Sequence, residues 1–467
     1  MYNRTFLALG LASLPGVVQP ATAGHSELEQ IRAEMREIRQ GYETRIEALE
    51  NRIEELEGRQ ETAAAQTPAP AETPAPAPTA EPAQASAPTA ANAFNPAISL
   101  ILEGTYTHAP DGTRLLPGFF SAGEIGPEKR GFSLAESELA LSASIDPYLY
   151  GAAAIALEPD GEVAVEEAYF QTLGLGHGFT VKGGRFFTAI GYLNEIHQHA
   201  WDFFDAPIAY QVLLGTEAAG NHGDDGVQLR WVAPTDTFLE LGAELGRGKD
   251  FPSNDRNKNG IGAAGLFAHL GGDIGASHSY RAGLSWLGAW PKDRGSPAVD
   301  LDDVEVLNLF EGDSYVYAAD FVWKWAPNGD PSYRNFKLQG ELLWRDEHGR
   351  LTYDAEDASR GANRSGYSSD QLGGYLQAVY QFQPRWRAGL RGEWLHSAHL
   401  DLGDNAETLP DDDHDPSKYS VMLDYNPSEF SRFRLQFAYQ ELTDNESDQQ
   451  VILQYVHSLG SHGAHQF

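Results

Sequence analysis

Apolar and polar side chains alternate along most of residues 94–467, in short segments that turn-forming residues separate. A period of two places successive side chains on opposite faces of a β-strand, so each segment predicts one strand with an apolar and a polar face. Sixteen strands are predicted, at residues 97–108, 132–145, 148–157, 163–171, 179–187, 226–233, 238–246, 262–271, 279–288, 314–326, 335–347, 371–383, 386–397, 417–425, 431–441 and 449–459.

The connections between the predicted strands alternate in length. Turn sequences such as Asp146-Pro147 and Gln383-Pro384 make one set short. The other set is long and polar, at residues 109–130, 188–225, 247–261, 289–313, 348–370 and 398–416. An even strand number, with short turns at one rim and long loops at the other, is typical of outer-membrane barrels. The predicted fold class is therefore all-β, a transmembrane antiparallel β-barrel of about sixteen strands.

The apolar faces of the predicted strands are rich in aromatic residues, as Phe433, Leu435 and Phe437 illustrate for one strand. The last segment, Val451–Phe467, keeps the alternation, ends on an aromatic residue and resembles the closing strand of an outer-membrane barrel. A soluble β-sandwich is the alternative. It would bury its apolar faces against each other and would not need aromatic outer faces on so many strands.

The polar faces carry most of the basic residues. The residues predicted to line the pore are Arg230, Arg281, Lys324, Lys337, Glu341, Arg345, Arg387, Arg391, Arg432 and Arg434. The plainer alternative is that a wet lumen accepts any polar side chain. Acidic residues concentrate instead in the long loops, and a basic wall facing acidic loops would set up a transverse field across a constriction. The formal net charge of −34 therefore does not decide the ion selectivity of the pore.

The third external loop, within residues 188–225, opens with the most distinctive stretch of the chain. We predict that it narrows the lumen with Glu195, His197, His199, Asp202 and Asp205. An extended backbone places Glu195, His197 and His199 on one face, and a helix places Glu195, His199 and Asp202 there. Imidazole and carboxylate groups suit zinc, so Glu195, His197, His199 and Asp202 are candidate metal ligands. Hydrogen bonding of these side chains to the backbone is the alternative, because His-x-His is a short motif.

Three segments precede the predicted barrel. Residues 1–23 have the features of a secretory signal, with Arg4, an apolar core from Phe6 to Leu14 and a small-residue cleavage site at Ala21–Ala23. Apolar spacings of three and four from Leu28 to Leu56 predict a coiled coil within residues 24–60. A single amphipathic helix packed on a domain is the alternative. Residues 61–93 form an Ala/Pro-rich linker, either an extended spacer or a flexible tether.

These segments predict a location and partners. The chain is expected in the bacterial outer membrane, surrounded by outer-membrane lipids, with the coiled coil in the periplasm near peptidoglycan. We expect the coil to be an oligomerisation stalk for a homotrimer. The excess of acidic residues argues against nucleic acid as a partner, and the absence of Cys is consistent with an envelope protein without disulfides.

The leading functional hypothesis is an outer-membrane porin for passive diffusion of small hydrophilic solutes or ions, without a cofactor. The sequence contains no Gly-x-Ser-x-Gly, phosphate loop or His-Glu-x-x-His motif, so we do not expect an enzyme. One alternative is a metal uptake channel or receptor, with zinc as the transported or regulatory ion. Another is a non-conducting envelope tether.

The signal peptide, coiled coil, Ala/Pro linker, sixteen-strand pattern and terminal Phe467 together resemble the phosphate-selective porin superfamily. Four stretches are similar to proteobacterial outer-membrane proteins labelled zinc-regulated or TonB-dependent receptors: Gly131–Leu139, Ile145–Tyr148, Val165–Tyr169 and His197–Asp205. This resemblance implies an outer-membrane barrel. The chain departs from the second label, because residues 24–93 hold no plug domain and the rest is too short for about 22 strands.

Overall fold

The computed structural model describes residues 96–110, 114–126, 130–216, 220–411, 414–444 and 446–460. The described strands are β1 (Ala97–His108), β2 (Gly131–Ser133), β3 (Ser137–Ser144), β4 (Leu149–Leu157), β5 (Val163–Thr172), β6 (Phe179–Phe187), β7 (Gly223–Val232), β8 (Phe238–Gly246), β9 (Ala263–Ile274), β10 (His278–Ala289), β11 (Arg294–Val299), β12 (Glu305–Trp325), β13 (Asn335–Tyr353), β14 (Asn363–Gln383), β15 (Trp386–Asp401), β16 (Ser417–Ser428), β17 (Ser431–Thr443) and β18 (Glu446–Gly460). The predicted signal peptide, coiled coil and linker, residues 1–93, lie outside the described residues.

Short helices occur in the connections. They are η1 (Leu193–Glu195), η2 (Gln198–Ala200), α2 (Ile208–Leu213), η3 (Pro327–Gly329) and η4 (Gly403–Glu407). Among the described residues, no helix is long and apolar enough to cross a membrane.

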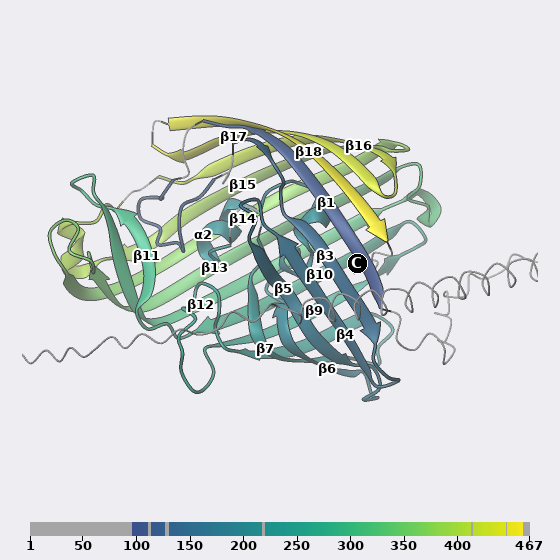
Figure 1. Cartoon of the computed structure of the whole chain (residues 1–467), viewed down its shortest axis with the longest axis horizontal. Helices are drawn as coiled ribbons and strands as arrows, with labels where there is room; N and C mark the ends of the chain where they lie inside the picture. The colour runs from purple at the N-terminus through teal and green to yellow at the C-terminus, as the bar shows by residue number, and fades with distance from the viewer. Residues whose placement is uncertain are drawn as a thin grey trace, which may run out of the picture. The chain divides into compact units, whose positions relative to one another are not determined.

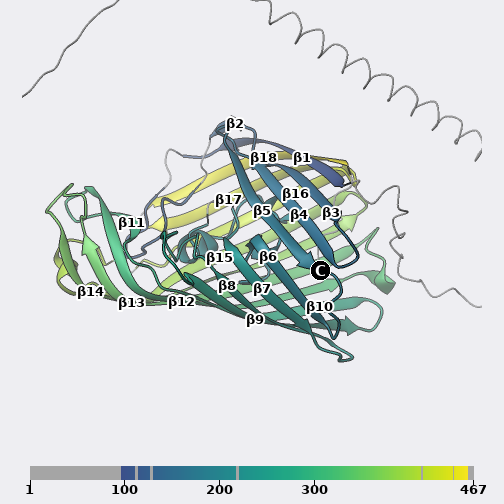
Figure 2. The same cartoon turned by 60° about the horizontal axis from the view of Figure 1, so that its bottom comes forward.

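The described strands form one closed antiparallel sheet. β2 and β3 occupy one strand position beside β1, and β10 and β11 occupy one strand position beside β12. The eighteen labelled strands of the described residues therefore form a barrel of sixteen strands. β1 closes the ring by pairing with β18, from Ser99 opposite Gly460 to His108 opposite Val451. Figures 1 and 2 show the tilted strands around the lumen, with β1 and β18 side by side. The predicted sixteen-strand antiparallel barrel is confirmed.

The two rims of the barrel differ as the sequence predicts. The rim where β1 begins and β18 ends carries short connections, such as residues 145–148 and 384–385. The opposite rim carries the long ones, including residues 188–222 between β6 and β7. We call these the short-turn rim and the long-loop rim.

Several strands differ from their predicted bounds. The segment predicted as one strand at 132–145 is two, β2 and β3, while β12 to β15 run further toward the long-loop rim. β11 lies within the predicted loop 289–313. Apolar alternation marks only the part of a strand that has an apolar outer face. In the extensions of β12 and β13 the outward side chains include exposed polar residues such as His348, while apolar residues such as Phe310 and Leu351 face inward and are buried. The apolar outer face therefore stops before the strand pairing does.

The wall has an apolar outside and a polar inside. On β17, Phe433 is 50% exposed and Leu435 46%, whereas Arg434 and Gln436 between them are buried. Exposed aromatic and aliphatic residues recur on other strands, among them Tyr106, Phe321, Leu342, Trp344, Leu390, Trp394, Leu453 and Tyr455. This distribution is that of an outer-membrane barrel, which meets lipid with its outer face.

Long loops fill part of the lumen. All six residues of α2 are buried, and α2 lies against β13, β14 and β15 inside the barrel (Figure 1). It belongs to a hydrophobic cluster that also includes Leu116 and Phe119 of the first long loop and Leu343 of the wall. A second cluster around Phe120 and Phe310 packs loops against the extended strands. The interior on the side of β12 to β15 is therefore a packed core.

Candidate functional site

The segment between β6 and β7, residues 188–222, is fixed inside the barrel by ion pairs with the wall. Glu195 Oε1 lies 2.5 Å from an Arg230 Nη atom, and Glu195 Oε2 lies 2.7 Å from an Arg281 Nη atom. Burial alone would raise the pKa of Glu195, but the two guanidinium groups outweigh it and lower the pKa to about 2. Glu195 is therefore ionised and bridges β7 and β10 at neutral pH.

Asp202 makes a second bridge of the same kind. Its two carboxylate oxygens lie 3.0 Å from Lys337 Nζ and 3.1 Å from an Arg387 Nη atom, respectively. Burial opposes ionisation of this carboxyl, but the two cations lower the pKa of Asp202 below its ordinary range. The bridge connects the loop to β13 and β15.

Asp205 makes the third bridge, between β15 and β16. It pairs with Arg391 at 2.9 Å and with Lys418. Burial would raise the pKa of Asp205, but Lys418 and Arg391 lower it below its ordinary range. Each of the three loop acids thus joins two basic residues of neighbouring or nearby strands. Three of these six wall cations also pair with wall acids, namely Arg230 with Glu240, Arg387 with Asp424 and Arg391 with Glu393.

Wall residues also hold both ends of α2. Glu393 accepts a hydrogen bond of 2.8 Å from the backbone N–H of Ile208, at the helix start. Arg345, fully buried, donates to the carbonyl oxygens of Val212 at 3.0 Å and Leu213 at 3.4 Å, at the helix end. A carboxylate at the first turn and a guanidinium at the last both satisfy free backbone groups and match the helix dipole.

Other predicted pore-lining residues bind the loop backbone. Glu341 accepts hydrogen bonds of 2.9 Å from the N–H groups of Tyr192 and Leu193. Arg432 donates to the carbonyl oxygen of His199 at 2.7 Å, and Arg434 to that of Trp201 at 3.1 Å. Lys324 lies opposite Lys337 in the β12–β13 register. The basic wall that the sequence predicts is present, but most of it is occupied in holding the loop.

Polar space remains on the side of β3 to β8. A lower cavity of about 640 Å³ runs from the short-turn rim, at Ala97 and Tyr150, to Glu138 and His197. An upper cavity of about 240 Å³ lies on the long-loop side, and its walls include Glu158 and Glu166. Phe187 lines both cavities, so the two cavities lie on either side of this buried residue.

Carboxylates outnumber cations in both cavities. The lower cavity is lined by Glu138, Glu167, Glu195 and Glu240 against Lys182, Arg230 and His197. The upper cavity is lined by Glu136, Glu158, Glu166 and Asp250 against Lys249. Burial and the neighbouring Glu166 raise the pKa of Glu136, which lies in the connection before β3, to about 10, so the charged carboxylates of the upper cavity at neutral pH are Glu158, Glu166 and Asp250. The two open cavities are therefore lined by an excess of carboxylates, whereas the part of the wall that the loop covers carries mainly Arg and Lys side chains.

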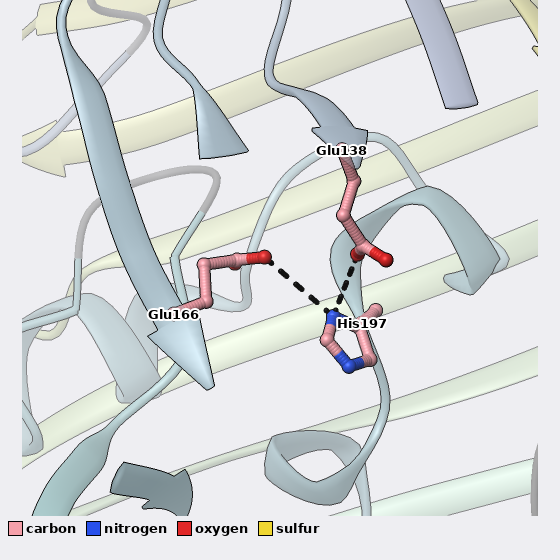
Figure 3. A group of neighbouring side chains, drawn as sticks. All are labelled: Glu138, Glu166 and His197. Atoms are coloured by element: carbon pink, nitrogen blue, oxygen red, sulfur yellow. Dashed lines mark ion pairs between the residues drawn. The ribbon is translucent and has the colours of Figure 1, made fainter. Parts of the chain in front are cut away.

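His197 lines the lower cavity and is surrounded by carboxylates. Its Nδ1 is 2.9 Å from Glu138 Oε2 and 3.7 Å from Glu166 Oε2 (Figure 3). Its Nε2 is 3.1 Å from Glu167 Oε2. Burial alone would lower the pKa of His197, but the three carboxylates raise it well above its ordinary value. His199 Nδ1 lies 3.4 Å from Glu138 Oε2.

The four residues predicted as metal ligands do not converge. Glu195 and Asp202 are held by wall cations, whereas His197 and His199 face Glu138. Among the described residues, the group of ligand-type atoms that lie within reach of one ion is Glu138, Glu166 and His197. Spacing within the loop could not reveal this, because the carboxylates come from β3 and β5.

Sequence reasoning missed Glu138, Glu166, Glu167 and Lys418. A signal for the pair on β5 exists. Ala154 and Ile155 of β4 face Glu167 and Val165, so Glu166 is an extra residue, a β-bulge. The bulge turns both glutamates inward between the exposed Val165 and Ala168. Two consecutive acids inside a lipid-facing strand indicate such a bulge, since strict alternation would place one of them in the bilayer.

A curated relative extends over most of the chain. An uncharacterized protein of Aquifex aeolicus (strain VF5) is 32% identical over 410 residues, which cover 80% of this chain and 80% of that protein. The chain belongs to the same family as this Aquifex protein. No family model matches the sequence.

Solved structures of outer-membrane proteins are similar to the chain at low sequence identity. The outer membrane channel DcaP of Acinetobacter baumannii is 12% identical with a TM-score of 0.49, over 78% of this chain and 97% of that chain. The anion-selective porin from Comamonas acidovorans is 10% identical with a TM-score of 0.48, over 78% and 99%. Salmonella typhi OmpF is 11% identical with a TM-score of 0.46, over 79% and 99%.

Proposed function

We propose that this protein is an outer-membrane channel through which small hydrophilic solutes and ions diffuse, and that it prefers cations. The barrel supplies a lipid-facing outer wall, and the loop of residues 188–222 narrows the lumen. The route follows the wall of β3 to β8, from the upper to the lower cavity. Flux through it depends on width and charge, with no covalent step.

The observation that carries the proposal is the division of the lumen. Apolar residues fill the side of β12 to β15, while the side of β3 to β8 keeps two polar cavities on either side of Phe187. A barrel serving only as an anchor has no need of polar cavities at both ends of a fixed loop. The loop bridges favour a permanent constriction, because three acids bind six wall cations.

The cation preference rests on the same division. Arg230 and Arg281 share the loop carboxylate Glu195, and Arg230 also pairs with Glu240. Lys337 pairs with Asp202, so the field of these wall cations is reduced at short range. The carboxylates around both cavities remain in excess. A narrow polar route lined by one sign of charge concentrates ions of the opposite sign.

The test is single-channel recording of the full-length protein, folded in detergent, in a planar bilayer under a KCl gradient. We expect stepwise openings and a reversal potential on the cation-selective side. Glu167→Gln should shift the reversal potential toward zero, because it removes a carboxylate from the lower cavity. Openings in groups of three would agree with the predicted homotrimer.

The matched control is Glu429→Gln, which removes the same charge from the exposed short turn between β16 and β17. It should leave the reversal potential unchanged. A bilayer that stays silent would refute the channel, and a reversal potential on the anion side would refute the cation preference.

A further inference from the structure

Three side chains from separate parts of the chain meet beside the constriction. Glu138 comes from β3, Glu166 from β5 and His197 from the inserted loop (Figure 3). One ligand-type atom of each lies within 4.8 Å of the other two. Their side chains are 3%, 11% and 18% exposed, so the group is largely removed from bulk water.

The converging atoms lack hydrogen bonds. Oε2 of Glu138, Oε2 of Glu166 and Nδ1 of His197 are buried and have no hydrogen-bond partner, although they lie at ion-pair distance from one another. A buried polar atom without a hydrogen bond is unfavourable, and more so when it is charged. These three atoms pair only with one another, and a cation bound at the point where they converge would contact all three.

The backbone is built to bring Glu166 into this group. Barrel closure requires only regular alternation, in which one of the two adjacent residues Glu166 and Glu167 would face lipid. The bulge at Glu166 interrupts the β4–β5 ladder and turns the carboxylate inward. Bulges that re-aim a side chain are common beside functional sites.

The distances suit a transition metal ion. A tetrahedral ion with metal–ligand bonds of about 2.1 Å separates its ligand atoms by about 3.4 Å. The observed separations from His197 Nδ1, 2.9 Å to Glu138 and 3.7 Å to Glu166, lie on either side of this value. His199, whose Nδ1 is 3.4 Å from Glu138 Oε2, lies close enough to contribute.

The second nitrogen of His197 has the partner that a metal-bound imidazole usually has. Its Nε2 lies 3.1 Å from Glu167 Oε2 and can donate a proton to that carboxylate. Such a bond fixes the tautomer that leaves the Nδ1 lone pair free for a metal, and it raises the basicity of the ligand. One imidazole with two carboxylates favours zinc over magnesium, which prefers oxygen ligands and retained water.

We propose that Glu138, Glu166 and His197 bind a divalent transition metal, with zinc as the best fit, between the two cavities. Glu167 orients His197, and His199 completes the coordination. Binding itself does not depend on transport. Its effect on flux rests on the proposed channel function, since an ion held there blocks the route.

The experiment is zinc titration by isothermal calorimetry of the untagged full-length protein, folded in detergent. We expect one zinc ion per chain, and we expect Glu138→Gln, Glu166→Gln and His197→Gln each to weaken binding at least about tenfold. X-ray absorption of the zinc-loaded protein should show one or two imidazole ligands with oxygen in the remaining positions. His348→Gln, at an exposed histidine on β13, is the control and should bind zinc like the wild type.

The outcomes separate the site from the channel. Absence of wild-type binding, or binding that the three variants leave unchanged, overturns the site whether or not the variants fold well. Zinc that lowers the conductance of the wild type but not of His197→Gln places the site on the route. Zinc binding by a protein that does not conduct keeps the site and refutes the channel. Conductance without zinc binding keeps the channel and refutes the site.

Discussion

Single charged residues inside this barrel act in opposed sets. A wall carrying Arg230, Arg281 and Lys337 would be strained by repulsion if these cations faced only one another. The loop acid Glu195 lies between the first two and Asp202 pairs with the third. The loop and the wall therefore stabilise each other, and neither set of charges is favourable alone.

The pH dependence of Glu195 tests this coupling. Arg230 and Arg281 outweigh the effect of burial and lower the pKa of Glu195 from its ordinary value of 4.5 to about 2 in the folded protein. The pairing of Glu195 therefore contributes its full stabilisation above pH 4.5, and this stabilisation is lost as the pH falls through about 2. We expect the wild type to melt above Glu195→Gln, with a Tm gap that is constant from pH 7 to 4.5 and closes toward pH 2. Thermal melts of both proteins across this range measure the gap.

Glu429→Gln should show no such gap at any pH, because Glu429 is exposed in a short turn. A gap that already closes between pH 6 and 5 would mean that Glu195 is not held ionised by its two arginines.

At the residue scale, the sequence predicts which face of a strand a side chain lies on better than it predicts which residues that side chain contacts. Period-two alternation places Arg387, Arg391 and Arg434 inside, and all three point into the lumen. It does not show that they bind the loop, because each contact joins residues far apart in the chain. Glu166 escapes the pattern for a different reason, since a bulge changes which face a residue occupies.

At the scale of elements, the inserted loop is a small core attached to the wall at several points. α2 is too short to be stable by itself, and its six residues are buried against β13 to β15. Glu393 and Arg345 hold its ends, and the three acid bridges hold the preceding segment. Such an element should leave the wall only when several of these contacts break together.

Asp205→Asn tests the attachment of this element. The change leaves Lys418 and Arg391 without their loop partner, a loss of about 3–5 kcal/mol for a buried pair. We expect a larger and noisier single-channel conductance, together with faster hydrogen exchange in residues 198–213. The barrel strands should keep their exchange protection.

The control for this variant is Asp303→Asn, at an exposed position of the loop between β11 and β12. It should change neither measurement. If Asp205→Asn also behaves like the wild type, the ion pairs do not hold the loop in place.

Strands were predictable as elements and α2 was not. A strand with one apolar and one polar face produces a period-two alternation that can be recognised in the sequence. The sequence of α2, Ile208 to Leu213, is apolar on nearly every side because it is enclosed by the wall, so it has no amphipathic period to detect. The extended parts of β12 and β13 are missed for a different reason, since there the apolar residues such as Phe310 and Leu351 face inward and the outward face is largely polar, the reverse of the pattern in the lipid-facing part.

At the scale of the whole molecule, the barrel is complete without the segments before it. The ring of strand pairs runs from β1 to β18 within residues 97–460. The strand count and the asymmetry of the rims follow from the sequence alone. The division of the lumen into a packed side and a side with cavities could not be predicted from the sequence. It depends on which loops pack inside the barrel and on contacts between residues far apart in the chain.

Removal of residues 24–93 therefore should not prevent folding. We expect the shortened protein to form a barrel with the same unit conductance, because no described strand is lost. If the predicted coil is a trimer stalk, openings in threes should give way to single openings. Single-channel recording and cross-linking measure both properties.

The same variant tests the predicted envelope tether. A peptidoglycan pull-down that captures the full-length protein but not the shortened one, together with a silent bilayer for both, would favour a tether over a channel. A shortened protein that fails to fold would show that the barrel needs its N-terminal segments.

The seam between β1 and β18 has a consequence for biosynthesis. The two strands that close the ring come from opposite ends of the described chain, so β1 keeps one free edge until the last strand has been made. A message truncated before residue 446 would yield a chain with two open edges, each a row of unpaired N–H and C=O groups able to recruit strands from other chains. Such a product is expected to aggregate rather than to form a slightly smaller barrel. The presence of the C-terminal strand therefore distinguishes a chain that can close its barrel from one that cannot.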